Sequence, residues 1–445
     1  MDTPICDFVK KYSESNSLRF HMPGHKGKDF LGIERLDITE INGADSLYEA
    51  EGIIKTSEKN ATSLFGCPTF YSSEGSSQCI RAMLYLVVLY AKLQEKKPLI
   101  LAGRNAHKTF LSAAALLDFD IEWINPRCNE SYLSCNVNAD ELDKQLENAA
   151  VKPVAIYLTS PDYLGNCADI KLISDVCHKH NVLLAVDNAH GAYLKFLSES
   201  VHPIDLGADI CCDSAHKTLP ALTGGAYLHV SDNAHDIIRN NVKNALALFG
   251  STSPSYIILQ SLDAVNKYID DGYKEKLMSV ISGISSLKNK LSGIGYSFIG
   301  NEPLKLTIET KKYGYTGYDF AYILEKNNII CEFSDQDYVV LMLTPENEKS
   351  NLEFLRKVLS AIPRLSEIAV SPPEFRPCIR ARSVREAVFS PQERISVSDS
   401  VGRILAVSDT SCPPAVPIVI SGEIIDNHAK ECFEYYGIKE CTVIK

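Results

Sequence analysis

A lysine and an aspartate near the middle of the chain each follow a short apolar run. Residues 182–186 form one run and lead directly to Asp187, while residues 208–212 lead through Asp213 to Lys217. Short apolar runs bounded by turn residues, with helical stretches between them, are typical of buried parallel strands. Ligands of such sheets bind beyond the carboxyl ends of the strands. We therefore expect an amine and a carboxylate to face one ligand at this edge of a sheet.

This pair of side chains suits one cofactor, pyridoxal 5'-phosphate (PLP). Its aldehyde forms a Schiff base with an amine, and its ring withdraws electrons best when a carboxylate keeps the ring nitrogen protonated. A buried carboxylate is costly unless it is paired, and the protonated nitrogen would be the partner of Asp187. Lys217 is the expected nucleophile. The alternative interpretations are a helix N-cap for Asp187 and a solvated strand-end lysine for Lys217.

A second feature suits the phosphate group of the same cofactor. Gly75, Ser76 and Ser77 stand immediately before an apolar run that begins at residue 80. Unpaired amides at a helix amino terminus, together with two hydroxyl groups, form an anion site. From these residues alone, simple N-capping by either serine is favoured over a phosphate site.

Five segments resemble the Orn/Lys/Arg decarboxylase family of fold-type I PLP enzymes, from about residue 20 to about residue 425. In decreasing order of importance they are SAHKTLPALTGGA, DNAHGA, FHMPGHKG, RNAHKTF and STSPSYIILQSLD. The resemblance implies an α/β fold of the aspartate-aminotransferase type (fold type I). This fold has a large PLP domain with a mainly parallel seven-stranded sheet, and a smaller α/β C-terminal domain. The resemblance also implies the short form of the family, without the N-terminal wing domain.

The resemblance implies that Gly75, Ser76 and Ser77 hold the phosphate, and it gives roles to further residues of the site. His107 is expected to stack on the cofactor ring, where a flat imidazole makes an offset contact. His190 is expected to lie beside the phenolic oxygen of the ring or the reacting carboxylate. Ser214 and His216, next to Lys217, are expected to contact the phosphate or the substrate.

The STSPSY segment carries an expectation about assembly. Its residues Ser251 and Thr252 resemble residues that reach the phosphate of the neighbouring subunit's cofactor. An active site shared in this way lies across a two-fold interface. The resemblance therefore implies a homodimer with shared active sites.

Two acidic residues are candidates for binding the distal cation of a basic amino acid. Asp45 lies in an acidic segment, residues 37–54, that resembles the family's entry loop, and Glu423 lies in PPAVPIVISGEIID. A desolvated cation needs charge-assisted pairing with a carboxylate. Both acids also have a plainer interpretation, as a solvated loop face or a structural contact.

Three positions depart from the family pattern. Asn188 stands where the family often has glutamate, Tyr193 where it has histidine, and Asp162 where a threonine is common. None of these changes removes a chemical requirement. They leave open the charge of the pocket and the choice of substrate, and Asp162 either reads the substrate or caps its own turn.

The pattern along the chain predicts four parts. Residues 1–55 form an N-terminal segment, and residues 56–260 form the PLP-binding large domain. Residues 261–370 contain a connector helix, expected over 261–291, followed by a small α/β domain. Residues 371–445 begin with proline-rich stretches and form a C-terminal subdomain.

Composition limits the partners of the chain. Its 445 residues carry a formal net charge of -11, which argues against nucleic-acid or anionic-membrane binding because both need a basic face. The amino terminus lacks the apolar core of a signal peptide. The longest apolar stretch, residues 82–91, is shorter than the roughly 20 residues of a spanning helix.

The 14 cysteines include no CxxC pair and no zinc spacing. We expect a cytoplasmic protein with reduced thiols and no metal.

The expected activity is decarboxylation of arginine, lysine or ornithine to the corresponding amine and CO2. The Cα–carboxylate bond is held perpendicular to the cofactor ring so that its electrons enter the π system. Lys217 or His216 then returns a proton to Cα. An aminotransferase or another fold-type I PLP enzyme, which would use an arginine to bind the substrate α-carboxylate, is the first alternative, and a catalytically silent regulatory homologue is the second. The arginines available in the C-terminal half are Arg376, Arg380, Arg382 and Arg385.

Overall fold

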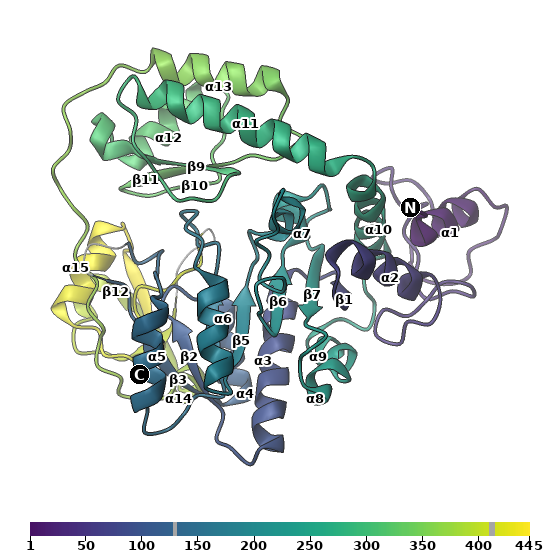
Figure 1. Cartoon of the computed structure of the whole chain (residues 1–445), viewed down its shortest axis with the longest axis horizontal. Helices are drawn as coiled ribbons and strands as arrows, with labels where there is room; N and C mark the ends of the chain where they lie inside the picture. Colours follow the sequence, from purple (N-terminus) through teal and green to yellow (C-terminus); the bar gives the residue numbers. More distant parts are fainter. Residues whose placement is uncertain (128–130, 409–413) are drawn as a thin grey trace. The chain divides into compact units, whose positions relative to one another are not determined.

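The computed structural model describes residues 1–127, 131–408 and 414–445 (Figure 1). Pro413, the first residue of the PPAVPIVISGEIID segment, lies outside the described residues. The chain divides into two compact units. Unit 1 comprises Met1–Pro98, Val154–Ile156 and Ile170–Glu275, and unit 2 comprises Leu99–Pro153, Tyr157–Asp169 and Lys276–Lys445.

The main sheet has seven strands in the order β1-β7-β6-β5-β4-β2-β3. The pairs β5–β6 and β2–β3 are parallel, whereas β7 is antiparallel to both β6 and β1. The expected seven-stranded α/β sheet is confirmed, and it is a mixed sheet. Its strands are β1 Thr69–Ser72, β2 Leu99–Gly103, β3 Asp120–Ile124, β4 Ala155–Thr159, β5 Leu183–Asp187, β6 Ile210–Asp213 and β7 Ala226–Val230.

The apolar runs of the sequence correspond to the interior of this sheet. Every residue of β2, β5, β6 and β7 is buried. Strands that are covered on both faces need apolar side chains at successive positions, since both faces of the sheet avoid water. The expected strands before Asp187 and Asp213 therefore appear as β5 and β6.

The helices of unit 1 surround its strands. Helix α3 has ten buried residues and packs against β5, β6 and β7, and α7 is a single turn directly after β6. These helices are α1 Pro4–Ser13, α2 Ile53–Phe65, α3 Ser76–Leu93, α6 Ile170–Lys179, α7 Ala215–Thr218, α8 Asp236–Arg239, α9 Val242–Phe249 and α10 Tyr256–Asp270.

A buried carboxylate joins three of these helices. Asp263 of α10 accepts the backbone N–H groups of Ile5 and Cys6 in α1, at 2.9 and 3.0 Å. Its other oxygen accepts the hydroxyl of Ser57 in α2 at 2.5 Å. Because the carboxylate is fully buried and its three donors belong to α1 and α2, its role is to hold α10, α1 and α2 together.

Unit 2 contains two smaller antiparallel sheets. One has the order β10-β11-β9-β8 and is covered on one face by α11, α12 and α13 (Figure 1), while the other has the order β12-β14-β13. The strands are β8 Phe298–Ile299, β9 Lys305–Glu309, β10 Phe333–Ser334, β11 Tyr338–Met342, β12 Gln392–Ser396, β13 Leu405–Val407 and β14 Glu440–Ile444. The helices are α4 Lys108–Leu117, α5 Ala139–Asn148, α11 Tyr273–Ser292, α12 Gly317–Lys326, α13 Lys349–Ala361, α14 Val384–Phe389 and α15 Asn427–Tyr435.

The single connector helix expected over residues 261–291 is wrong. The chain forms α10 from Tyr256 to Asp270 and then α11 from Tyr273 to Ser292. Gly272, between the two helices, has φ +76°, in the left-handed region where glycine commonly ends a helix. The first helix also begins five residues earlier than expected, because Ser255 caps it by accepting the N–H of Ile258 at 3.4 Å.

Two further observations bear on the cell-biological expectations. Within the described ranges, none of the helices is long and apolar enough to cross a membrane. The twelve cysteines in these ranges are free thiols.

Candidate active site

Two neighbouring strands of unit 1 bring the predicted lysine and aspartate to one edge of the sheet. In the parallel pairing of β5 with β6, Asp187 is the register partner of Cys212. Asp187 is the last residue of β5 and only 2% exposed, and Lys217 lies in α7, four residues beyond the end of β6. The amine and the carboxylate thus follow adjacent parallel strands.

Asp187 is held by its immediate surroundings. One carboxylate oxygen accepts the backbone N–H of Ala189 at 3.2 Å and lies 3.7 Å from the thiol of Cys212. Both contacts come from the ends of β5 and β6, so the two strands fix the position of the carboxylate. A carboxylate buried and oriented in this way suits a cationic partner at the sheet edge.

His190 lies against the lysine. Its Nε2 atom is 3.0 Å from Nζ of Lys217, and the imidazole is 4% exposed. His190 belongs to the turn after β5, whereas Lys217 belongs to the turn after β6. The two predicted catalytic side chains are therefore in hydrogen-bond contact, which is the spacing that proton transfer requires.

The predicted phosphate segment forms the amino terminus of α3. Gly75 is the N-cap residue and has no side chain to accept the first N–H groups of the helix. The hydroxyl of Ser214, after β6, donates to the hydroxyl of Ser76 at 2.7 Å. Amides and hydroxyl groups therefore gather at the end of an 18-residue helix whose dipole favours an anion.

A glycine turn supports this end of α3. The N–H of Gly75 donates to the carbonyl of Gly224 at 2.7 Å. Gly224 has φ +99°, and a Cβ atom there would lie 2.9 Å from the carbonyl oxygen of Ser73. The next carbonyl, of Gly225, is 3.0 Å from Nδ1 of His216, so that nitrogen carries a proton and donates it to the carbonyl.

The donor set of unit 1 fits PLP. It contains an amine and an imidazole in contact, a buried carboxylate at the end of the neighbouring strand, and a helix amino terminus with hydroxyl groups. These are the groups that the aldehyde, the ring nitrogen and the phosphate of the cofactor require.

Sequence reasoning missed one cluster beside this site. Asp213, the last residue of β6, is fully buried and has the Nε2 atoms of His202 and His229 each 3.1 Å from one of its oxygens. Burial alone would raise the pKa of Asp213, but the two imidazoles bring this pKa well below its ordinary value. An acid at the end of an apolar run is a signal for such a cluster, but the two histidines are distant in sequence and give no spacing pattern.

Two predicted residues of unit 2 are held by their own turns. His107 caps α4, with Nδ1 accepting the N–H of Thr109 at 3.1 Å, so the orientation of its ring is fixed. Asp162 accepts the backbone N–H and the side-chain amide of Asn166, each at 2.8 Å. Of the two readings of Asp162, capping of its own turn is the one that these contacts support.

Both candidates for the distal cation are engaged by other groups. The carboxylate of Asp45 accepts backbone N–H groups of Glu51, Gly52, Ile54 and Lys55 at 2.8 to 3.3 Å, which fixes the start of α2. Glu423 pairs with Arg104, with 3.3 Å between Oε2 and Nη2, and also accepts the N–H of Ile420 at 2.7 Å. Burial raises the pKa of Glu423. Glu423 therefore makes the structural contact that was its plainer interpretation, whereas Asp45 is a buried cap and not part of a solvated loop face.

The two residues of the STSPSY segment and the four arginines lie at exposed positions, whereas Tyr193 is fully buried. Ser251 and Thr252 are exposed in the segment before α10, and the N–H of Ser251 donates to the side chain of Glu74, next to Gly75. Among the arginines considered for an aminotransferase, Arg385 donates to the carbonyl of Ala115 at 2.7 Å.

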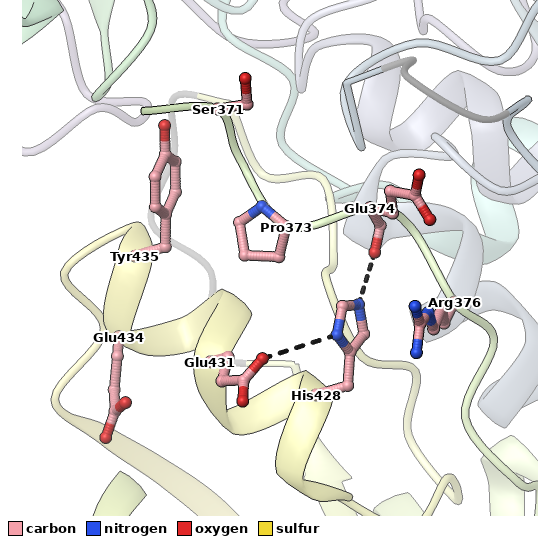
Figure 2. A pocket seen from close by; sticks show the side chains of 8 residues that line it. All are labelled: Ser371, Pro373, Glu374, Arg376, His428, Glu431, Glu434 and Tyr435. Atoms are coloured by element: carbon pink, nitrogen blue, oxygen red, sulfur yellow. Dashed lines mark hydrogen bonds and ion pairs between the residues drawn. The ribbon is translucent and has the colours of Figure 1, made fainter. Parts of the chain in front are cut away.

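The C-terminal part of unit 2 also has an open pocket of about 580 Å³, which contains none of the predicted site residues. Figure 2 shows His428 between Glu431 and the main chain of Glu374 in this pocket. Its lining residues are Ser371, Pro373, Glu374, Arg376, His428, Glu431, Glu434 and Tyr435.

The fold and the site define a fold-type I PLP-dependent enzyme, and solved structures agree on the fold. The structure is similar to the lysine decarboxylase of Francisella novicida, with a TM-score of 0.75 and 16% identity over all of this chain and 81% of that chain. Lysine decarboxylase A from Pseudomonas aeruginosa gives a TM-score of 0.78 and 16% identity, covering 99% of this chain and 80% of that chain.

Sequence comparison defines the family. The pattern described as Orn/Lys/Arg decarboxylase, major domain, matches residues 3–294, and the pattern of the C-terminal domain of this family matches residues 371–442. The chain belongs to the Orn/Lys/Arg decarboxylase family, and its cofactor is PLP.

Several bacterial relatives match over almost their whole length. The chain is 30% identical to the uncharacterized protein YaaO of Bacillus subtilis, over 96% of this chain and 92% of that protein. It is also 30% identical to an arginine decarboxylase of Halalkalibacterium halodurans, over 95% of this chain and 91% of that protein. An arginine decarboxylase of Bacillus subtilis is 29% identical, again over 95% of this chain and 91% of that protein.

Proposed function

We propose that this enzyme decarboxylates arginine to agmatine and CO2, with lysine and ornithine as the alternative substrates of the same class. The placement of Lys217 and Asp187 after adjacent parallel strands, with His190 3.0 Å from the lysine amine, is the observation that carries the chemistry. The arginine decarboxylases of Halalkalibacterium halodurans and Bacillus subtilis, which match over nearly the whole chain, support arginine.

Each group of the site has a proposed task toward the cofactor. Lys217 provides the amine that holds the aldehyde, and Asp187 keeps the proton on the ring nitrogen. The amino terminus of α3 with Ser76, Ser77 and Ser214 holds the phosphate. His107, whose ring α4 orients, stacks on the cofactor ring. When bound, PLP supplies the electron sink that receives the electron pair of the broken bond.

The residues around the lysine have the proposed task of moving one proton. Loss of CO2 breaks the bond between Cα and the carboxylate, and one proton must then be added to Cα to complete the amine. Lys217 is a candidate donor, since His190 in contact with it can replace its proton. His216, directly before Lys217 in the chain, is the second candidate, and its Nδ1–H donates to the carbonyl of Gly225, which orients the ring.

The proposal extends to assembly. Ser251 and Thr252, which are exposed in one chain, are proposed to contact the phosphate bound by a second chain, so that the enzyme is a homodimer with shared sites. A cytoplasmic location and a role in polyamine biosynthesis belong to the same proposal.

A substrate panel tests the activity. Purified holoenzyme is incubated with arginine, lysine or ornithine, and both CO2 and keto acid are measured. We expect CO2 in equal amount to the amine, no keto acid, and a higher kcat/KM for arginine than for the other two. Keto acid in place of CO2 would support an aminotransferase. Absence of any product, with no change of cofactor absorbance on adding these amino acids, would indicate a silent homologue.

A further inference from the structure

We propose that Asp213 and Asn188 form a positioning pair, in which a buried carboxylate fixes the amide that shapes the turn carrying Asp187 and His190. This inference rests on the proposed role of Asp187 and Lys217 in holding the cofactor. It gives a function to a fully buried cluster and to one of the positions where this chain departs from the family pattern.

The strand register brings the two side chains together. The N–H of Asn188 donates to the carbonyl of Cys212 at 3.0 Å, which continues the parallel pairing of β5 and β6 by one residue. The side-chain amide of Asn188 then donates to Oδ1 of Asp213 at 2.6 Å. Both residues are fully buried, so no water competes for this hydrogen bond.

Three donors hold Asp213 as a carboxylate. His202 and His229 each place Nε2 3.1 Å from Oδ2, and Asn188 faces Oδ1. Three N–H donors favour the ionised form of the Asp213 carboxyl group, since only the carboxylate has two oxygens that both accept and do not donate. The two imidazoles also hold the pKa of Asp213 low against the effect of burial.

The carboxylate determines which way the amide of Asn188 points. With Nδ2 directed at Asp213, the amide oxygen is buried and has no hydrogen-bond partner among the described residues. An unsatisfied buried acceptor is unfavourable by itself. The orientation is therefore imposed by the charge of Asp213 and not by the surroundings of the oxygen.

The amide in turn shapes the loop after β5. The N–H of Gly191 closes this turn on the carbonyl of Asn188 at 2.7 Å, and a Cβ atom at Gly191 would lie 2.0 Å from the amide oxygen. The turn between these two residues contains His190, which contacts Lys217. Asp213 is also joined through Ser214 to the turn that carries Lys217. One pair thus links the turns after β5 and β6.

The pair explains why glutamate, which the family often has at position 188, is unsuited to this chain. A second carboxylate at position 188 would face Asp213, and two carboxylates at such a distance cannot both remain ionised. The two positions are therefore predicted to be coupled: an acid at one requires an amide at the other.

A double-mutant cycle tests this coupling in the full-length holoenzyme. Asn188→Asp places two carboxylates together, whereas Asn188→Asp combined with Asp213→Asn exchanges the amide and the acid and restores one N–H···O contact. The readouts are the dissociation constant of PLP, the midpoint of the pH titration of the bound cofactor's absorbance, and kcat. Asp263→Asn is the matched control, because it changes a buried carboxylate of unit 1 whose hydrogen-bond partners in α1 and α2 include neither member of this pair.

We expect Asn188→Asp to lower kcat by about 10- to 100-fold, the usual effect of a displaced catalytic group, and to shift the titration midpoint by about one pH unit or more. The double variant is expected to recover PLP affinity and the titration midpoint to within about threefold and about 0.3 pH units of the wild type. Asp263→Asn is expected to lower thermal stability and to leave the midpoint unchanged.

The inference would be overturned if the double variant lost PLP affinity and kcat by the sum of the two single effects. It would also be overturned if Asn188→Asp changed neither kcat nor the titration midpoint. If Asn188→Asp does not fold, Asn188→Ala removes the same link while leaving the two histidine contacts, and an unchanged titration midpoint there would also overturn it. Stoichiometric zinc in the purified wild type would replace it with a metal site, since donor atoms of His202, Cys211 and Asp213 lie within 4.8 Å of one another. Borohydride labelling of Lys217 in the wild type, measured in parallel, separates failure of the pair from failure of the proposed function.

Discussion

Lys217 is the residue on which the proposed chemistry depends most. Replacing it with alanine removes the amine that holds the aldehyde and leaves His190 without its contact at 3.0 Å. We expect Lys217→Ala to lower CO2 release by roughly 10³-fold or more at saturating PLP, the scale of loss seen when a covalent catalytic residue is removed.

Lys195 provides the matched control for this substitution. It is a lysine of the same unit whose half-buried side chain places its amine 2.7 Å from Asp205. Because this ion pair includes none of the predicted site residues, Lys195→Ala should keep activity within about twofold. Equal activity of Lys217→Ala and the wild type would contradict the assignment.

A second prediction at the residue scale concerns Asp335 in the β10–β11 hairpin. One carboxylate oxygen accepts the N–H groups of Asp337 and Tyr338 at 2.7 Å, and the other is buried without a partner among the described residues. Burial and the charge of Asp337 raise the pKa of Asp335 to about 7. Between its ordinary value and about 7 the folded protein therefore holds this proton more tightly than the unfolded chain.

The sign of the pH dependence follows from this shift. The contribution of Asp335 to the free energy of unfolding falls as pH rises toward 7, by at most about 4 kcal/mol at about 1.4 kcal/mol per pKa unit. Asp335→Asn should raise the melting temperature at pH 8 and flatten its decrease between pH 5 and pH 8. Asp140→Asn, at an exposed position of α5, is the control, and identical pH profiles for wild type and Asp335→Asn would refute the prediction.

At the scale of elements, the amino terminus of α3 depends on the glycine turn packed beneath it. Gly224→Ala would place a Cβ atom 2.9 Å from the carbonyl of Ser73 and disturb the hydrogen bond from Gly75 to Gly224. We expect the dissociation constant of PLP to rise about tenfold, which corresponds to about 1.4 kcal/mol.

Gly402 allows the steric effect of this substitution to be isolated. It also has a left-handed backbone, with φ +83°, but a Cβ atom there would meet nothing within 4 Å. Gly402→Ala shares the backbone strain of about 1 to 3 kcal/mol and lacks the close contact. PLP affinity, measured by fluorescence titration, should fall in Gly224→Ala alone; an equal fall in both variants would show that the turn has no special role.

The middle of the sheet was predictable because β2, β5, β6 and β7 are buried on both faces. β5 and β6 appear in the sequence as apolar runs that end in acids, and no other local pattern competes with them. The break between α10 and α11 was not predicted, since charged and apolar residues continue on both sides and only the left-handed Gly272 ends the first helix.

The site was predictable in part. Lys217, Asp187 and the segment from Gly75 to Ser77 stand at strand and helix ends, where periodicity changes. Asp45 was not predictable as a cap, because its partners are backbone N–H groups six to ten residues further on, which carry no side-chain signal. Asp213 likewise acquires its histidine partners only through the fold.

At the scale of the whole molecule, the proposed homodimer makes a prediction that a single chain cannot satisfy. In this proposal, each site combines Lys217 of one chain with Ser251 and Thr252 of the other chain. Lys217→Ala therefore damages the site of its own chain, whereas Ser251→Ala with Thr252→Ala damages the site of the second chain. Mixing them under subunit exchange, at limiting PLP, should restore about a quarter of wild-type activity, because half of the dimers are mixed and each has one intact site.

The expected size of this recovery follows from the symmetry of the dimer. A mixed dimer has one site with both defects and one site with neither. Sites contained within single chains would show no recovery, since every site then retains one of the two defects. Recovery absent under conditions where mixed dimers are detected by mass spectrometry would therefore contradict the shared site.

Reduction of the holoenzyme with borohydride followed by peptide mapping tests the central claim most directly. The amine of Lys217, in α7 after β6 and 3.0 Å from Nε2 of His190, is predicted to become covalently linked to the pyridoxyl group. We expect one such link per chain. A label on a different lysine, or a protein that takes up no PLP, would contradict this account.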